Sequence, residues 1–156
     1  MEITHKGNTL KIIRGIYNFN SVKEDTALTI GSFDGVHLGH QMVLNDLKAA
    51  ALKRGLKSAV MIFEPQPQEY FSGEKAPARL MRLRDKLKTF CDSGIDIVVC
   101  LRFDDSLRNL TADAFISIII NGLYAKHLII GDDFRFGCDR SGDFKMLQNS
   151  GKLNNF

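Results

Sequence analysis

The chain has 156 residues, of which 44% are hydrophobic, and its 21 basic and 18 acidic side chains give a formal net charge of +3. This length and apolar content predict one domain with a core of its own and exclude two large domains. The charge is small and dispersed, and aromatic residues make up 9% of the chain without any Trp. We therefore expect no nucleic-acid partner, since neither a basic arm nor a stacking platform is evident.

The three cysteines, Cys91, Cys100 and Cys138, are widely spaced and form no CxxC pair. This pattern disfavours a disulfide framework and a thiolate zinc site, and it fits a reducing compartment. The N-terminal residues contain no apolar signal region, and no apolar run approaches the length of a membrane span. We expect a soluble cytoplasmic protein without a membrane partner.

Strands and helices are expected to alternate along the chain. The helix at 39–54 has an apolar stripe that includes Val43, Leu44 and Leu47, and Gly55 ends it. The predicted strands are 27–33, 58–63, 95–103 and 128–131, and the predicted helices are 39–54, 82–93, 111–121 with Thr111 as N-cap, and 144–149. This order predicts a Rossmann-like α/β fold, with an open parallel sheet and helices on both faces. Ligands of such folds bind beyond the carboxyl ends of the strands.

The most informative segment runs from Thr29 to His40, where a glycine-rich turn joins an apolar strand to a helix. Its three glycines allow close approach of a ligand or of backbone. His37 and His40, three residues apart, share one face of the helix start. With backbone N–H groups and the positive helix end, they predict a site for an anion, which we interpret as the polyphosphate of a nucleotide. The alternatives are an ordinary surface and core histidine, or zinc, which the spacing disfavours.

The sequence Gly31-Ser-Phe-Asp-Gly-Val-His-Leu-Gly-His40 resembles the HxGH signature of nucleotidyltransferases. Its Phe-Asp-Gly-Val-His form closely resembles bacterial FAD synthetases, the bifunctional riboflavin kinase/FMN adenylyltransferases. The resemblance extends over residues 10–156 and includes Pro77-Ala-Arg-Leu80 and Lys86. It implies the nucleotidyltransferase fold.

Two further loops match that family. Phe63-Glu-Pro-Gln-Pro67 leaves a buried strand, and Gly131-Asp-Asp-Phe-Arg-Phe-Gly137 follows another. A planar flavin needs apolar or aromatic walls and a few hydrogen-bonding partners, which these loops offer. The alternative for the second loop is that Phe134 and Phe136 pack into the core. The resemblance implies a flavin site with Phe63, Pro65, Asp133 and Phe136.

The activity implied by the resemblance is transfer of AMP from ATP to FMN, giving FAD and pyrophosphate, with Mg²⁺ accompanying ATP. The implied catalytic residues are His37 and His40, and the implied ATP and phosphate-binding residues are Gly31, Phe33, Asp34, Gly35 and Gly39. No protein metal ligand is assigned. Two alternatives stay open: another HxGH cytidylyl- or adenylyltransferase, and a non-catalytic flavin- or nucleotide-binding module.

We expect residues 10–156 to form a C-terminally truncated adenylyltransferase domain and residues 1–9 to be an N-terminal extension. FAD synthetases continue with an Ile-Ser-Ser-Thr-x-Ile/Val-Arg segment and a riboflavin kinase barrel, neither of which this sequence contains. The resemblance therefore implies that kinase activity is absent and that adenylyltransferase activity is impaired by the truncation.

Overall fold

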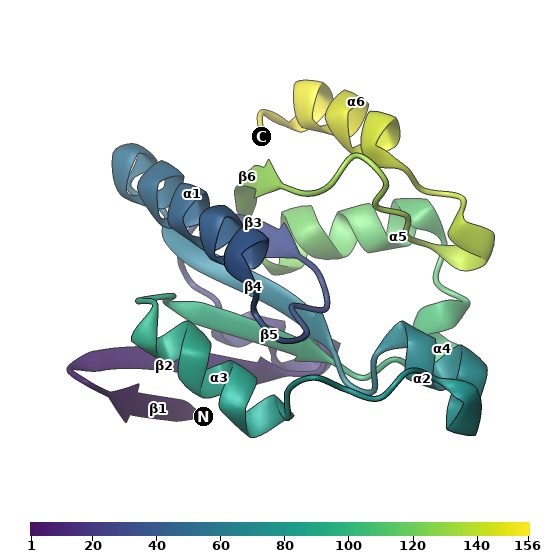
Figure 1. Ribbon diagram of the computed structural model, residues 1–156. Coiled ribbons are helices and arrows are strands. Elements are labelled where there is room, and N and C mark those ends of the chain that lie inside the picture. The colour runs from purple at the N-terminus through teal and green to yellow at the C-terminus, as the bar shows by residue number, and fades with distance from the viewer.

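One six-stranded sheet, in the order β1-β2-β5-β4-β3-β6, forms the centre of the molecule (Figure 1). The computed structural model describes residues 1–156. The strands are β1 (Glu2–His5), β2 (Asn8–Arg14), β3 (Thr26–Ile30), β4 (Lys57–Phe63), β5 (Ile97–Leu101) and β6 (Ala125–Ile129). All neighbouring strands are parallel except β1 and β2. The predicted α/β fold is confirmed, with the correction that one edge of the sheet is antiparallel.

The helices differ widely in length. The long ones are α1 (Leu38–Arg54), α3 (Leu83–Asp92) and α6 (Phe144–Asn154), and the short ones are α2 (Pro67–Ser72), α4 (Asp105–Arg108) and α5 (Ala112–Ser117). Short 3-10 helices occur at η1 (Ile16–Ser21), η2 (Gly73–Lys75) and η4 (Cys138–Arg140), and η3 (Ile118–Gly122) is π-helical. None of the helices is long and apolar enough to cross a bilayer.

Two apolar layers cover the two faces of the sheet. In β4, Ala59 and Met61 belong to the layer that includes α5 and α6, and Val60 and Ile62 belong to the layer formed with α1 and α3. Because successive side chains of a strand point to opposite faces, a strand buried on both sides is apolar throughout. This explains the continuous run Ser-Ala-Val-Met-Ile-Phe in the sequence.

The N-terminal hairpin was not predicted. Lys6 and Gly7, both with positive φ, make the tight turn between β1 and β2. Part of the segment expected to be an extension therefore pairs with the sheet. Lys-Gly is a weaker hairpin signal than Asn-Gly, and the half-exposed β1 shows little apolar alternation.

The predicted helix at 111–121 is shorter than expected. Thr111 is its N-cap, as predicted, and accepts a hydrogen bond from the N–H of Ala114 at 3.1 Å. The α-helix ends at Ser117, and the run of three isoleucines that follows is π-helical. β-Branched side chains lose χ1 freedom against the preceding helical turn, so this run has a lower propensity to continue the α-helix.

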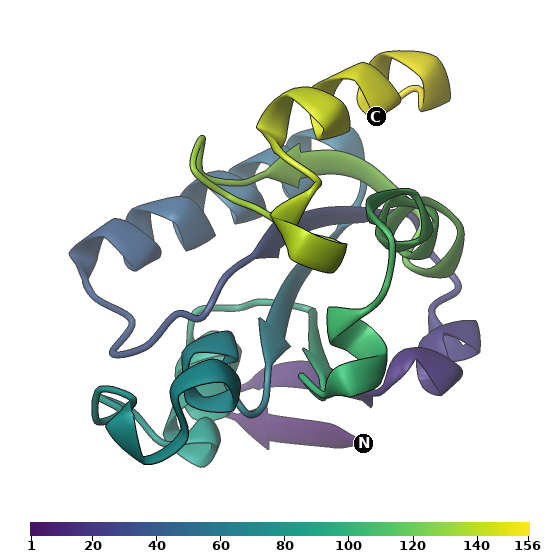
Figure 2. The ribbon, with the colours of Figure 1, turned by 90° about the vertical axis from the view of Figure 1, so that its right-hand side faces the viewer.

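Other boundaries also moved. The last strand lies at Ala125–Ile129 rather than 128–131, and the last helix continues to Asn154 rather than ending at 149. Helices α2 and α4 were not predicted. Together with the loop at 131–142 they gather beyond the carboxyl ends of the strands, at the right of Figure 1, and this end faces the viewer in Figure 2.

Candidate functional site

The turn between β3 and α1 presents unpaired backbone donors. The N–H groups of Ser32 to Gly35, and those of His37 to Gly39 at the helix start, donate to no acceptor within the protein. Phe33 has a φ of +51°, so this turn adopts a backbone conformation that non-glycine residues seldom take. Its ring is buried and packs against Phe90. A helix start with several free N–H groups suits an anion.

The two histidines lie side by side at this turn. Their rings stack with centroids 3.6 Å apart and an angle of 18° between the planes. His37 is the N-cap of α1, and its Nδ1 accepts a hydrogen bond from the backbone N–H of His40 at 3.3 Å. The proton of neutral His37 is therefore assigned to Nε2, which can donate outward.

Burial and the adjacent His37 lower the pKa of His40 below its ordinary value of 6.5, with a further contribution from Lys86. His40 Nδ1 is buried without a hydrogen-bonding partner. An anion placed against this pair would stabilise the protonated imidazole and so reverse the shift.

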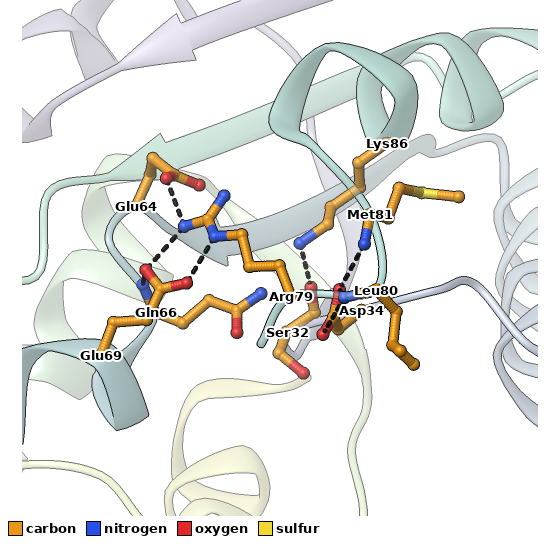
Figure 3. Close-up of polar contacts among 9 residues, drawn as sticks. All are labelled: Ser32, Asp34, Glu64, Gln66, Glu69, Arg79, Leu80, Met81 and Lys86. Atoms are coloured by element: carbon orange, nitrogen blue, oxygen red, sulfur yellow. Dashed lines mark hydrogen bonds and ion pairs between the residues drawn. The ribbon is translucent and has the colours of Figure 1, made fainter. Parts of the chain in front are cut away.

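Asp34 organises the turn from within. Its carboxylate oxygens accept hydrogen bonds from the backbone N–H groups of Leu80 and Met81 at 3.0–3.1 Å (Figure 3). These contacts fasten the segment before α3 to the β3–α1 turn. These contacts suit Asp34 to orienting the turn.

The predicted glycines leave room for neighbouring side chains of the protein. A Cβ on Gly35, which has a φ of +81°, would lie 3.2 Å from the Leu80 side chain. A Cβ on Gly39 would lie 3.0 Å from the ring of His37, and one on Gly31 would lie 3.1 Å from the ring of Phe33. Larger residues would therefore displace the side chains that define the turn.

Arg79 links two carboxylates beside the turn. Its guanidinium donates to Glu69 through two nitrogens and to Glu64, and Glu69 also accepts from the backbone N–H of Gln66 at 3.2 Å (Figure 3). The hydrogen bond and charge of Arg79 lower the pKa of Glu69. This network joins the end of β4 to α2 and to the segment before α3.

A cavity of about 740 Å³ opens beyond the ends of β3, β4 and β5. Gly31 and Ser32 line one side of it, so the cavity adjoins the glycine-rich turn. Its aromatic walls are Phe63, Phe71, Phe103, Phe115, Phe134 and Phe136, and its cationic lining residues are Arg108, Arg135 and Arg140. Aromatic rings can enclose a planar ligand. Arginines can donate hydrogen bonds to the polar edge of such a ligand or pair with a negatively charged group on it.

The predicted flavin residues separate into two groups. Phe63 and Phe136 line the cavity, whereas Pro65 and Asp133 do not. Phe136 is also 6% exposed and part of the core, so core packing and cavity lining are combined in one residue. Asp133 is exposed in the loop after β6.

Sequence reasoning missed several lining residues. Phe71 comes from α2, and Phe103 follows β5 by two residues. Their rings are 5.7 Å apart, and the guanidinium of Arg108 lies 5.2 Å from the Phe71 ring centre. Aromatic residues just past the carboxyl end of a strand were the signal that could have identified Phe103.

Residues 19–156, which are most of the chain, match the FAD synthetase family. The chain belongs to the FAD synthetase family. This confirms the family inferred from the motifs, and it does not favour the cytidylyltransferase alternative.

Curated relatives agree with this assignment. The chain is 51% identical to the bifunctional riboflavin kinase/FMN adenylyltransferase of Escherichia coli (strain K12), over 91% of this chain and 46% of the relative. It is 50% identical to the protein of that name from Haemophilus influenzae, over 92% of this chain and 47% of the relative. The chain thus spans about half the length of the curated relatives it matches.

A solved structure shares the fold. A Streptococcus pneumoniae protein described as a macrolide-efflux protein superposes with a TM-score of 0.75, over 90% of this chain and 47% of that one. At 24% identity this similarity shows that the two chains share an α/β fold, and nothing more.

Proposed function

We propose that this FAD synthetase chain is an FMN adenylyltransferase domain, which transfers AMP from ATP to FMN to give FAD and pyrophosphate. The observation that carries the proposal is the junction of two sites. The phenylalanine-lined cavity suits a flavin, and the adjoining turn with free N–H groups and paired histidines suits a polyphosphate. Gly31 and Ser32 belong to both, so a flavin phosphate leaving the cavity would meet ATP at the turn.

The chemistry demands little acid or base catalysis. The second pKa of a phosphate monoester is near ~6, so the FMN phosphate is largely dianionic at neutral pH and can attack the α-phosphorus of ATP unaided. The protein must then hold two anions in line and stabilise the charge that develops on the leaving pyrophosphate. Imidazoles and backbone N–H groups at a helix start meet that demand.

Each residue has a distinct proposed role. His37 and His40 would donate to the triphosphate, and N–H groups between Ser32 and Gly39 would share its oxygens. Asp34 would keep the turn in place through Leu80 and Met81. Phe63 and Phe136 would enclose the flavin ring, whereas Pro65 and Asp133 would act from outside the cavity.

Mg²⁺ would accompany ATP as its counter-ion. It keeps several waters and is commonly held by phosphates with one or two carboxylates. The Asp34 carboxylate already accepts three backbone hydrogen-bonding contacts, so it fits a water-mediated contact better than a direct one. When bound, the ion would neutralise phosphate charge.

The compartment and the domain limits form part of the same proposal. We place the protein in the cytoplasm, which the unpaired thiols of Cys91, Cys100 and Cys138 support. We place the adenylyltransferase domain at residues 10–156, with the preceding residues adding strand β1 and the start of β2 to the edge of its sheet. Riboflavin kinase activity, which the names of the relatives include, is not proposed for this chain.

Incubation of the chain with FMN and Mg·ATP, followed by chromatography for FAD, tests the proposal. The Escherichia coli relative serves as the positive control, and CTP replaces ATP in a parallel reaction. FAD formed from ATP supports the proposal. Turnover of CTP without a flavin requirement would contradict it, and tight binding of FMN and ATP without product would identify a binding module instead.

A further inference from the structure

Lys86 is the one charged side chain that is fully buried, at 0% exposure. It lies on α3, and its side chain reaches Ser32 in the glycine-rich turn (Figure 3). Burial lowers the pKa of its ammonium group, and Asp34 opposes this shift. Burying an ammonium group is costly unless it is paired, so this position calls for an explanation. The function proposed above makes no use of it.

The ammonium group makes one hydrogen bond within the protein, to the carbonyl oxygen of Ser32 at 2.7 Å. Ser32 lies in the turn and also lines the cavity. Asp34, Glu64, Arg79, Cys100 and His40 also interact electrostatically with Lys86. The ammonium group thus lies between Asp34 and Arg79 (Figure 3). Its hydrogen bond is made to the glycine-rich turn.

The far side of the same peptide group carries the N–H of Phe33. In a trans peptide the carbonyl oxygen and the following N–H point in opposite directions. A charged donor on the Ser32 oxygen therefore polarises the peptide and strengthens the Phe33 N–H as a donor. That N–H has no acceptor within the protein.

We infer that Lys86 is a positioning residue of the polyphosphate site, which holds the Ser32–Phe33 peptide so that the Phe33 N–H donates to a phosphate oxygen. The inference rests on the proposed binding of ATP at this turn. On this inference Lys86, which does not line the cavity, affects the binding of phosphate ligands and leaves the binding of the flavin unchanged.

Calorimetric titration of the 156-residue chain with pyrophosphate, Mg·ATP and FMN tests the inference. Lys86→Met keeps the length of the side chain and removes the charge. It is expected to weaken pyrophosphate and Mg·ATP binding about tenfold, the order expected for a charge-assisted hydrogen bond. FMN affinity is expected to stay at the wild-type value. Lys88→Met, an exposed lysine on the same helix, is the matched control and should bind all three ligands normally.

A second measurement does not depend on a folded variant. In the wild-type chain, the NMR signal of the Phe33 amide proton should move strongly downfield when pyrophosphate binds, because that N–H gains an acceptor. A Lys86→Met protein that binds pyrophosphate within twofold of wild type would overturn the inference, as would a Phe33 amide unaffected at saturation. Failure of the wild-type chain to bind either phosphate ligand would instead refute the proposed function.

Discussion

The stacked histidines place a second imidazole against His40. Two imidazolium rings 3.6 Å apart repel each other, and burial further lowers the pKa of His40. The free protein therefore disfavours the protonated form of His40. A bound phosphate favours the protonated ring and raises this pKa again, so affinity should increase as pH falls through the bound-state pKa and level off below the free-state pKa.

This predicts that pyrophosphate binding strengthens as the pH falls from about 8 to about 5, the range in which histidine side chains titrate, and the lowered free-state pKa of His40 places the levelling-off toward the acid end. His40→Ala should bind more weakly and show a flatter pH dependence than wild type. Calorimetry gives the pyrophosphate affinity of each protein at each pH. The ratio of the two affinities is compared, because the protonation of pyrophosphate itself affects both equally. Parallel pH curves for the two proteins would remove His40 from the phosphate site.

Asp34 offers a stability test at the same scale. Asp34→Ala leaves the N–H groups of Leu80 and Met81 without their acceptor. We expect the free energy of unfolding to fall by about 1–3 kcal/mol, the usual cost of removing such a partner. Urea unfolding gives this value, and Asp46→Ala, an exposed carboxylate within α1, is the control. Equal losses in both variants would show that the Asp34 contacts add nothing specific.

At the scale of elements, α2 depends on contacts distant in sequence. It has six residues, and its segment brings Phe71 to the cavity wall. Arg79 fastens it through Glu69 to the Glu64 region. A short helix with no buried residue of its own needs such external support.

Arg79→Met should therefore loosen α2 and leave two partly buried carboxylates close together. We expect faster amide exchange across residues 67–72 and an affinity for FMN weaker by up to about fivefold, since partly exposed ion pairs contribute about 0.2–1 kcal/mol. Hydrogen exchange with mass spectrometry and FMN titration provide the readouts. Arg84→Met, an exposed arginine of α3, should change neither, and unchanged exchange in Arg79→Met would contradict the supporting role.

Elements with a local sequence pattern could be predicted, whereas those that depend on distant contacts could not. The strands β3, β4 and β5 and the helices α1 and α3 follow from local apolar patterns, and the turn with its histidines follows from glycine spacing. The position of helix α2 depends on the contacts of Arg79 with Glu69 and Glu64, which lie ten and fifteen residues earlier in the chain. A single sequence does not reveal such pairings. Phe136 was found because its loop matched a motif, whereas Phe71 lacked such a signal in the local pattern.

For the whole molecule, the order of strands separates the N-terminal hairpin from the site. β1 is the edge strand beside β2, and the turn and cavity lie beyond β3, β4, β5 and β6. The hairpin is held against α3 by the His5–Asp92 pair and by contacts of the Cys91 thiol with the Ile3 and Asn8 carbonyls. Its contribution should therefore be to stability, with no direct part in ligand binding.

Deletion of residues 2–6 removes β1 and exposes the backbone groups of β2 that it pairs. If this costs about 2 kcal/mol, the Tm should fall by about 4–8 °C in a domain of this size, with FMN and ATP affinity unchanged. Calorimetry and ligand titration measure both, and His5→Ala separates loss of the pair from loss of the strand. Since an uncovered edge strand can pair with another chain, the shortened protein should also self-associate in size-exclusion chromatography. An unaltered Tm would show that the hairpin does not stabilise the domain. Weaker FMN binding in a protein that remains folded would show that the hairpin does take part in ligand binding.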